Sequence, residues 1–358
     1  MGGVSGYAAM NSRVRVMYSG LLTPQIGLAL RDAADLSSLV TSLKNTDYNL
    51  YLKNVEEKDL APKHILSQVK SRIADAYLTV IHSAPVNTRP ILLQLFRHFE
   101  IDNLKAILRG IVTGSSWEQV QGVLFPLGSL NTLPAQQMLE SGNIEAAVAL
   151  LSHTAYYETL THALKRYSDE QSLFPLEVAL DLQYWHKLWA SANQLPGQDR
   201  AEARRIVGQL VDVTNLMWAI RYRVYYHLSE EEIINYTLPF GFRVRDEDIR
   251  NIAAGGDIVQ ILGRLYPGLR DVESLLEDPA SGLPKLELQL QRILREQLKT
   301  VFTGYPFHIG LGLAFPVLSE LELQDLTVLV EAKSARMPAD KFTPYLLMGL
   351  GSETGGAA

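Results

Sequence analysis

The hydrophobic positions of this chain recur with helical spacing over most of its length. Segments 64–82, 175–193 and 283–302 carry apolar residues every three or four positions, which places them on one face of an α-helix. Clusters of proline, glycine and asparagine separate the helical segments, for example at 83–90 and 194–198. Alternating β-branched runs are few. The pattern therefore predicts an all-α protein with no sheet.

One short helical element occurs three times. It opens with Asp35, Asn143 or Asp257, and apolar residues follow one, four, five and eight positions later. An Asp or Asn at the opening position can accept hydrogen bonds from the unpaired amides of a first helical turn. Each copy therefore predicts a capped helix with one buried apolar stripe.

A second element also occurs three times, at 100–110, 212–222 and 322–332. Each copy begins with an acid and an apolar residue, and has an Asn or Asp directly before a leucine. That Asn or Asp occupies equivalent places in the three copies, at Asn103, Asn215 and Asp325. Two interpretations remain open for these residues. They face a central axis, or they are buried hydrogen-bonding groups that fix the register between helices.

The order and spacing of the two elements indicate an internal repeat of about 110 residues. The opening residue of the first element precedes the Asn or Asp of the second by 68, 72 and 68 residues. The motifs LFPLG at 124–128 and TLPFG at 237–241 follow the second element in two copies. The repeat is permuted against the chain ends, so the two termini should share one helical bundle. The predicted units are 1–60 together with 310–358, then 61–170, and then 171–309.

A unit of this length exceeds the repeats of open helical solenoids, which run to about 47 residues. We therefore expect a compact cluster of three similar helical-bundle domains in a pseudo-threefold arrangement. Residues 301–319 form a long stretch without a charged residue. Their glycines and prolines favour a buried turn between helices over a membrane span.

Composition narrows the range of functions. The chain has 358 residues, of which 47% are hydrophobic and 20% charged, typical of a globular protein with a large core. Its net charge is −6 and it has no basic run, so neither nucleic-acid binding nor a polybasic membrane patch is indicated. The absence of cysteine excludes disulfides, thiolate metal sites and cysteine nucleophiles.

The residues predict no catalytic centre, cofactor or metal site. The phosphate-binding pattern G-x-x-x-x-G-K-[ST] is absent, and the histidines and acids lack the spacing of a zinc site. Tyr184, Trp185 and Trp189 have helical spacing. That spacing is typical of packing between helices, although such a group could also line a ligand pocket.

The candidate partner interface is a group of arginines and tyrosines that follows the second copy of the second element. It comprises Arg221, Arg223, Tyr225 and Tyr226. Arginine and aromatic side chains are enriched at protein interfaces. The alternative, equally open, is a partly exposed helix face with no partner.

Four segments together resemble a known family: 7–22, 96–110, 211–220 and 320–338. They include the sequence N-x-R-V-R at 11–15, and they lie at both ends and in the middle of the chain, so the resemblance spans nearly its whole length. With the ordered repeats, they are similar to the C subunit of archaeal and bacterial V/A-type ATP synthases, whose counterpart in eukaryotic vacuolar ATPases is the d subunit.

The resemblance implies a funnel of three similar helical domains on the cytoplasmic face of a membrane. Such a peripheral central-stalk subunit sits on the proteolipid rotor ring and receives the foot of the central shaft, made by the D and F subunits. The membrane stator subunit is a further partner to test. The resemblance implies no catalytic residues, and it implies that the membrane is met through partners alone.

Two other functions fit the residues. A helical-repeat scaffold or adaptor unrelated to a rotary motor would share the repeats but bind other partners. An all-α enzyme or ligand-binding protein would use the region of Trp185 and Trp189. It would need a deep pocket with converging polar groups.

Overall fold

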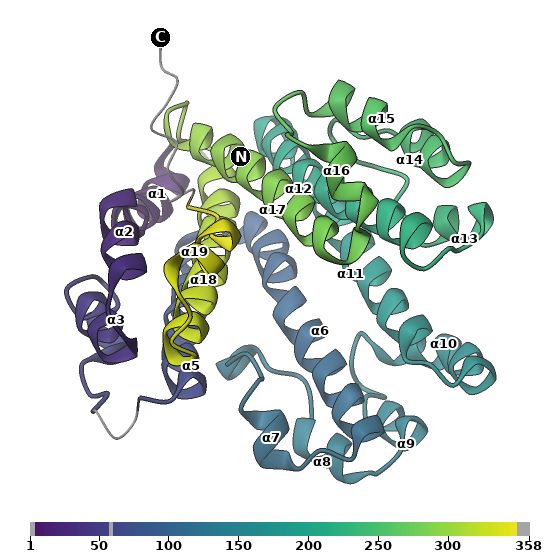
Figure 1. Cartoon of the computed structure of the whole chain (residues 1–358), viewed down its shortest axis with the longest axis horizontal. Coiled ribbons are helices and arrows are strands. Elements are labelled where there is room, and N and C mark those ends of the chain that lie inside the picture. Colours follow the sequence, from purple (N-terminus) through teal and green to yellow (C-terminus); the bar gives the residue numbers. More distant parts are fainter. Residues whose placement is uncertain (1–3, 57–59, 349–358) are drawn as a thin grey trace.

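Six long helices form the frame of the protein. The computed structural model describes residues 4–56 and 60–348, and within them the chain has helices but no strand, which confirms the all-α class. The long helices are α5 (Pro62–Ser83), α6 (Arg89–Thr113), α11 (Phe174–Gln194), α12 (Gly197–Val224), α17 (Pro279–Lys299) and α18 (Gly310–Ser334). Figure 1 shows them meeting toward the middle, with shorter helices around the rim.

The long helices pack in three pairs, α5 with α18, α6 with α11, and α12 with α17. A group of short helices lies between the two members of each pair along the repeat. Between α6 and α11 these are α7 (Trp117–Gln121), α8 (Ala135–Glu140), α9 (Ile144–Ala149) and α10 (Tyr157–Glu170). Between α12 and α17 they are α13 (Glu230–Asn235), α14 (Asp246–Ala253), α15 (Ile258–Leu265) and α16 (Val272–Glu277).

The third pair draws its short helices from both ends of the chain. They are α19 (Ala339–Phe342), which follows α18, and α2 (Pro24–Asp32), α3 (Leu36–Leu43) and α4 (Asn49–Leu52), which precede α5. One hydrophobic core contains Leu22, Leu39 and Leu52 together with Leu326 and Phe342. Segments from the two ends of the sequence are therefore packed into one body.

The repeated Asp and Asn residues cap helices as predicted. Asp35, Asn143 and Asp257 are the N-caps of α3, α9 and α15. Each side-chain oxygen accepts a hydrogen bond from the amide three residues later, at 2.8, 2.8 and 3.0 Å. A cap of this kind stabilises a helix by about 1 kcal/mol.

The expected buried turn at 301–319 is wrong for residues 310–319, which begin α18. All ten of these residues are buried, because α18 packs against α1 (Val4–Ser19), α5, α12 and α17. A helix enclosed on all sides needs no polar face. Its burial offsets the hydrogen bond that is lost at Pro316. Among the described residues, no helix is long and apolar enough to cross a membrane.

Helix α1 lies against the turns that connect one helix pair to the next. Asn11 donates a hydrogen bond to the carbonyl oxygen of Pro306 at 2.7 Å, and the Tyr18 ring stacks on Phe302 with centroids 3.8 Å apart. The amide of Ile309 donates to Asp199 at the start of α12, at 2.9 Å. Gly6 of α1 in turn lies beside Pro85. The three connecting turns therefore meet at one end of the molecule, which we call the turn end.

Candidate functional site: repeated polar anchors, a central cavity and an exposed corner

Asn103 and Asn215 are buried, and each holds a loop against a long helix. Asn103 on α6 accepts a hydrogen bond from the amide of Phe125 at 2.7 Å and donates one to the carbonyl oxygen of the same residue at 2.9 Å. Asn215 on α12 bonds Leu238 in the same way, at 2.8 Å in both directions. The partner is therefore loop backbone and not a second helix. Phe125 and Leu238 occupy the same place in the two Pro-containing motifs, directly before proline.

Asp325 on α18 holds the third loop with a different bonding pattern. Its two carboxylate oxygens accept hydrogen bonds from the amides of Leu347 and Met348, the second at 3.0 Å. Proline has no amide hydrogen, so a residue before proline offers one N–H and its own carbonyl, which suits asparagine. Leu347 is followed by Met348 and not by proline, so the two residues offer two successive N–H groups, which suit a carboxylate.

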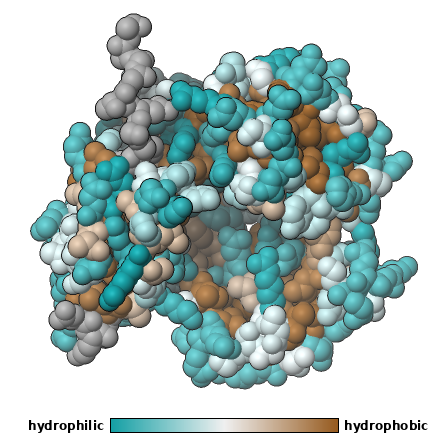
Figure 2. Space-filling model, viewed as in Figure 1, coloured by the Kyte–Doolittle hydropathy of each residue, from teal (hydrophilic) through white to brown (hydrophobic). Residues whose placement is uncertain are grey.

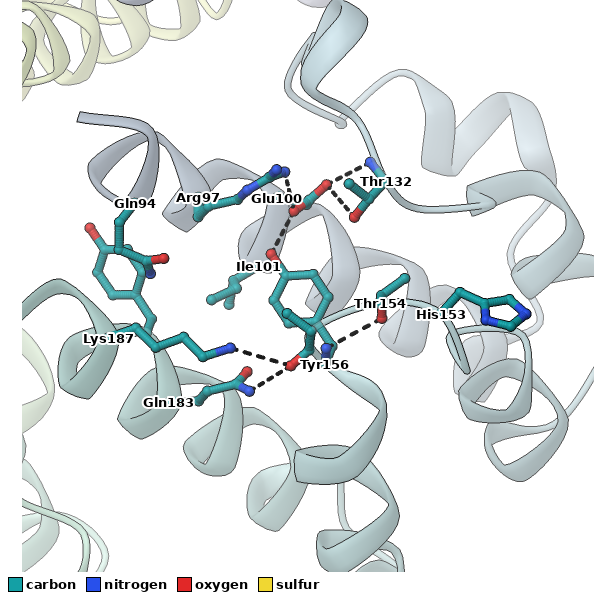
Figure 3. Close-up of a pocket in the computed structure, with 12 residues that line it drawn as sticks. Gln94, Arg97, Glu100, Ile101, Thr132, His153, Thr154, Tyr156, Gln183 and Lys187 are labelled. Atoms are coloured by element: carbon teal, nitrogen blue, oxygen red, sulfur yellow. Dashed lines mark hydrogen bonds and ion pairs between the residues drawn. The ribbon is translucent and has the colours of Figure 1, made fainter. Parts of the chain in front are cut away.

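A carboxylate three residues before each of these positions binds a second loop. Figure 3 shows this arrangement for Glu100 on α6. Glu100 accepts hydrogen bonds from the amide and hydroxyl of Thr132 at 2.7 and 2.9 Å, and from the hydroxyl of Tyr156 at 2.5 Å. Arg97 pairs with it at 2.6 Å. Both oxygens of this buried carboxylate are thus directed at protein donors.

Asp212 on α12 is the equivalent acid of the next copy. It accepts hydrogen bonds from the amides of Phe242, Arg243 and Val244 at 2.8, 2.7 and 3.2 Å. A Cβ on Gly241 would stand 2.4 Å from its Oδ1, so the chain can pass this carboxylate only with glycine there. Burial raises the pKa of Asp212 even though these amides favour its charged form.

Glu322 on α18 joins the N-terminal part of the chain to the frame. It accepts hydrogen bonds from the amide of Leu22 at 2.5 Å and from the hydroxyl of Tyr48 at 2.7 Å. Arg72 of α5 lies 3.7 Å away and donates to the same tyrosine hydroxyl at 3.2 Å. Burial raises the pKa of Glu322, which Arg72 partly opposes. We call each acid and its Asn or Asp partner, together with the loops that they hold, a polar anchor.

The polar groups of the anchors hold loops. Their carboxylates accept hydrogen bonds from backbone amides and hydroxyls, and the side-chain amides of Asn103 and Asn215 bond to loop backbone. Across residues 4–56 and 60–348, no three His, Asp or Glu side chains form a group that could hold a metal ion.

A cavity of about 210 Å³ lies between α11, α12, α17 and α18. Trp185 and Trp218 line it with Arg221, Glu287 and Glu320. Arg221 pairs with Glu287 of α17 at 3.2 Å. Figure 2 shows a recess in the middle of the visible face, with apolar side chains in its walls. Trp189, by contrast, is a packing residue, because its ring stacks on Phe240 with centroids 4.8 Å apart.

Tyr225 and Tyr226 lie at the end of α12, and their side chains are 54% and 50% exposed. Their rings contact each other with centroids 5.2 Å apart, and Tyr226 also contacts Phe174 at 6.1 Å. Arg223 is exposed and its guanidinium lies beside Gly255. We call Arg223, Tyr225 and Tyr226 the exposed corner. Arg221, one turn earlier, belongs to the cavity wall.

Sequence reasoning missed the acids and tyrosines that complete the anchors. The second element opens with an acid in each copy, at Glu100, Asp212 and Glu322. The sequence showed that these acids recur, but not which loops they bind. Tyr48 and Tyr156 each lie 13 residues after a helix cap, at Asp35 and Asn143. That equal spacing was the available signal for a buried hydroxyl with a repeated partner.

Comparison with known proteins gives a consistent result. A family model described as ATP synthase (C/AC39) subunit matches residues 10–345. The C subunit of the A-type ATP synthase of Methanocaldococcus jannaschii is 25% identical over 346 residues, covering 95% of this chain and 86% of that protein. The C subunits of the A-type ATP synthases of Methanobrevibacter smithii (25%, 91% of this chain and 88% of theirs) and Pyrococcus horikoshii (24%, 94% and 88%) are similar over comparable lengths.

Proposed function

Because the chain belongs to the ATP synthase (C/AC39) subunit family, we propose that it is a non-catalytic central-stalk subunit of a V/A-type rotary ATPase or ATP synthase. In this role it couples the central shaft to the membrane proteolipid ring, for ATP-driven ion pumping or ion-driven ATP synthesis. The observation that carries the proposal is the family match over residues 10–345, which confirms the resemblance expected from the sequence.

The polar anchors support a mechanical role. A subunit that transmits torque must resist shear between its parts, and closely packed helices with fully paired buried groups are stiff. The anchors fasten loops far apart in sequence to the long helices, as Glu322 does with Leu22, 300 residues away. Their threefold recurrence would distribute load over three similar attachments.

We propose that the three helix pairs form a funnel with a pseudo-threefold axis. The pairing favours unit boundaries at the connecting turns, so that α5 joins the first unit and α11 the second, in place of boundaries near residues 60 and 170. The central recess would receive the foot of the shaft, made by the D and F subunits. Trp185 and Trp218, which line the cavity between α11, α12, α17 and α18, would supply the aromatic anchors that such an interface uses.

We propose that the turn end faces the proteolipid ring on the cytoplasmic side of the membrane. Its exposed side chains include Arg13, Arg200 and Arg204, whereas Asp199 is occupied by the amide of Ile309. Membrane contact would be made through partners, and the membrane stator subunit is a further candidate for the outer surface.

The exposed corner and Arg221 remain the predicted partner interface. Two adjacent exposed tyrosines beside an arginine supply rigid apolar area with hydrogen-bonding tips, which suits protein recognition.

The test is purification of the assembly through a tag on this chain, with identification of its members by mass spectrometry. We expect the nucleotide-binding subunits, the shaft subunits and the proteolipid to copurify, and the isolated chain to leave ATP intact. Recovery with unrelated proteins and without any of these subunits would favour the adaptor interpretation instead.

A further inference from the structure

The third anchor differs from the other two in one chemical respect. Asn103 and Asn215 have a fixed donor and a fixed acceptor, whereas Asp325 can gain or lose a proton. We propose that Asp325 is a protonation switch for the backbone at residues 346–348: the carboxylate accepts two amides, and the neutral acid adopts the donor–acceptor pattern of the two asparagines. This device is independent of the partners that the chain binds.

The alternative state is already visible elsewhere in the molecule. A protonated Asp325 would carry one hydroxyl donor and one carbonyl acceptor, the same pair of functions that Asn103 presents to Phe125. In that state the acid would donate to the carbonyl oxygen of Leu347, still accept its amide, and release the amide of Met348. Because Met348 is not proline, the loop can satisfy either pattern.

The surroundings of Asp325 place the switch within reach of physiological pH. Its side chain is only 1% exposed, and this burial raises the pKa of Asp325 to about 7, although the amides of Leu347 and Met348 and the charge of Arg295 favour the carboxylate. Glu322, one turn earlier on α18, adds to the increase.

The other charged groups near this part of α18 are already engaged. Arg72 from α5 and Tyr48 from the start of α4 both face Glu322, and α17 contributes Arg295. From α19, Phe342 packs against Lys333 further along α18. On another part of α18, His98 of α6 pairs with Glu320. Arg292, also from α17, donates to the carbonyl oxygen of Leu346 in the same loop at 2.7 Å, and the charge of Arg295 acts on Asp325 itself.

The loop that Asp325 holds forms part of a cavity wall. Met348 lines a cavity of about 270 Å³ together with Leu22, Arg295 and Lys299. Glu322 holds Leu22 and Asp325 holds Met348, so two neighbouring carboxylates set opposite parts of this wall. Release of the Met348 amide would change the wall on one side while the Leu22 side stays fixed.

Amide hydrogen exchange of the full chain, resolved at Leu347 and Met348, tests the proposal between pH 5.5 and 8.5. After correction for intrinsic exchange, we expect the protection of Met348 to fall about tenfold on acidification, with a midpoint near 7, because one hydrogen bond to a charged group is lost. The protection of Leu347 should change much less. Phe125, held by Asn103, serves as the internal control and should show no such midpoint.

Two variants decide the assignment. Asp325→Asn should abolish the midpoint, and Asp325→Asn with Met348→Pro should recreate the pattern of Asn103 before proline and give a folded chain with pH-independent protection at Leu347. If Asp325→Asn alone does not fold, the carbon-13 shift of the Asp325 carboxyl in the unaltered protein gives the same answer. A midpoint that persists in either variant, or a carboxyl that does not titrate between pH 6 and 8, would overturn the proposal.

Discussion

The polar anchors and the exposed corner are built on opposite principles. The anchors recur in three copies, are buried and pair their polar groups with donors from distant parts of the chain. The exposed corner occurs once, and its two tyrosines are about half exposed. The features that recur in this triplicated chain therefore maintain its architecture, and we expect recognition of a partner to depend on features that differ among the copies.

The largest effect that distinguishes the two regions should come from Glu322→Ala. The change leaves the hydroxyl of Tyr48 and the amide of Leu22 buried without their acceptor, and it removes the carboxylate that pairs with buried Arg72. We expect the free energy of unfolding in denaturant to fall by about 3–5 kcal/mol. Glu331→Ala, at an exposed position on the same helix, is the control and should cost under about 0.5 kcal/mol. Similar values for the two variants would refute the role assigned to the anchors.

Asn215→Ala should have the next largest effect. It leaves the amide and carbonyl of Leu238 without their buried partner, and we expect a loss of about 2–3 kcal/mol in denaturant unfolding. Asn103→Ala should cost the same within about 1 kcal/mol, because its two bonds to Phe125 are equivalent. Strongly unequal losses would show that the anchors share a geometry but contribute differently to the free energy of unfolding.

A pH-dependent contribution of intermediate size should come from His98, which links α6 to Glu320 of α18 at 3.3 Å. Burial disfavours its charge, but Glu320, with smaller contributions from Asp102 and the carbonyl oxygen of Leu95, outweighs burial and raises the pKa of His98 to about 9. Since the folded pKa exceeds the unfolded value, this stabilisation is complete below about pH 6.5 and is lost as the pH rises through 9. We expect a loss of about 2–3 kcal/mol between these limits. In His98→Asn the unfolding free energy should lose this component of its pH dependence, and an unchanged profile would contradict the assignment.

Much of the architecture was predictable because its determinants are local. Helical spacing and the caps at Asp35, Asn143 and Asp257 depend on residues within one turn, so the all-α class and these three helix starts were confirmed. The error at 310–319 has the opposite cause. Proline and glycine there are local signals for a turn, and burial of α18 by four other helices overrides them. That burial depends on contacts which no short stretch of sequence specifies.

The candidate site was only half predictable for a similar reason. Recurrence identified Asn103, Asn215 and Asp325 as equivalent, but not the loops that they hold 22 or 23 residues downstream. The choice between asparagine and aspartate followed from the presence or absence of a proline after the bonded residue. This rule relates two positions that appear unrelated until the loop is folded against the helix.

The smallest effect on stability should come from the exposed corner and its neighbour Arg221. Arg221 can be compared directly with its equivalent in another copy of the repeat. Arg221 and Arg109 occupy equivalent places in their copies, and each pairs with an acid on the partner helix, Glu287 at 3.2 Å and Glu177 at 2.7 Å. Such partly exposed pairs contribute about 0–1 kcal/mol, so Arg221→Glu and Arg109→Glu should unfold at nearly the same denaturant concentration. We also expect the double change Tyr225→Ala and Tyr226→Ala to be nearly neutral for folding.

Recovery of partner subunits should distinguish variants that are equally stable. If the region around the end of α12 binds a partner, Arg221→Glu, Arg223→Glu and the double tyrosine variant should each lower the yield of rotor subunits recovered with the tagged chain, while Arg109→Glu should not. An equal loss with Arg109→Glu would mean that the arginines act through their interhelical ion pairs. Full recovery with all of these variants would leave the exposed corner as an ordinary helix end, and the interface would then have to be sought at the central recess or the turn end.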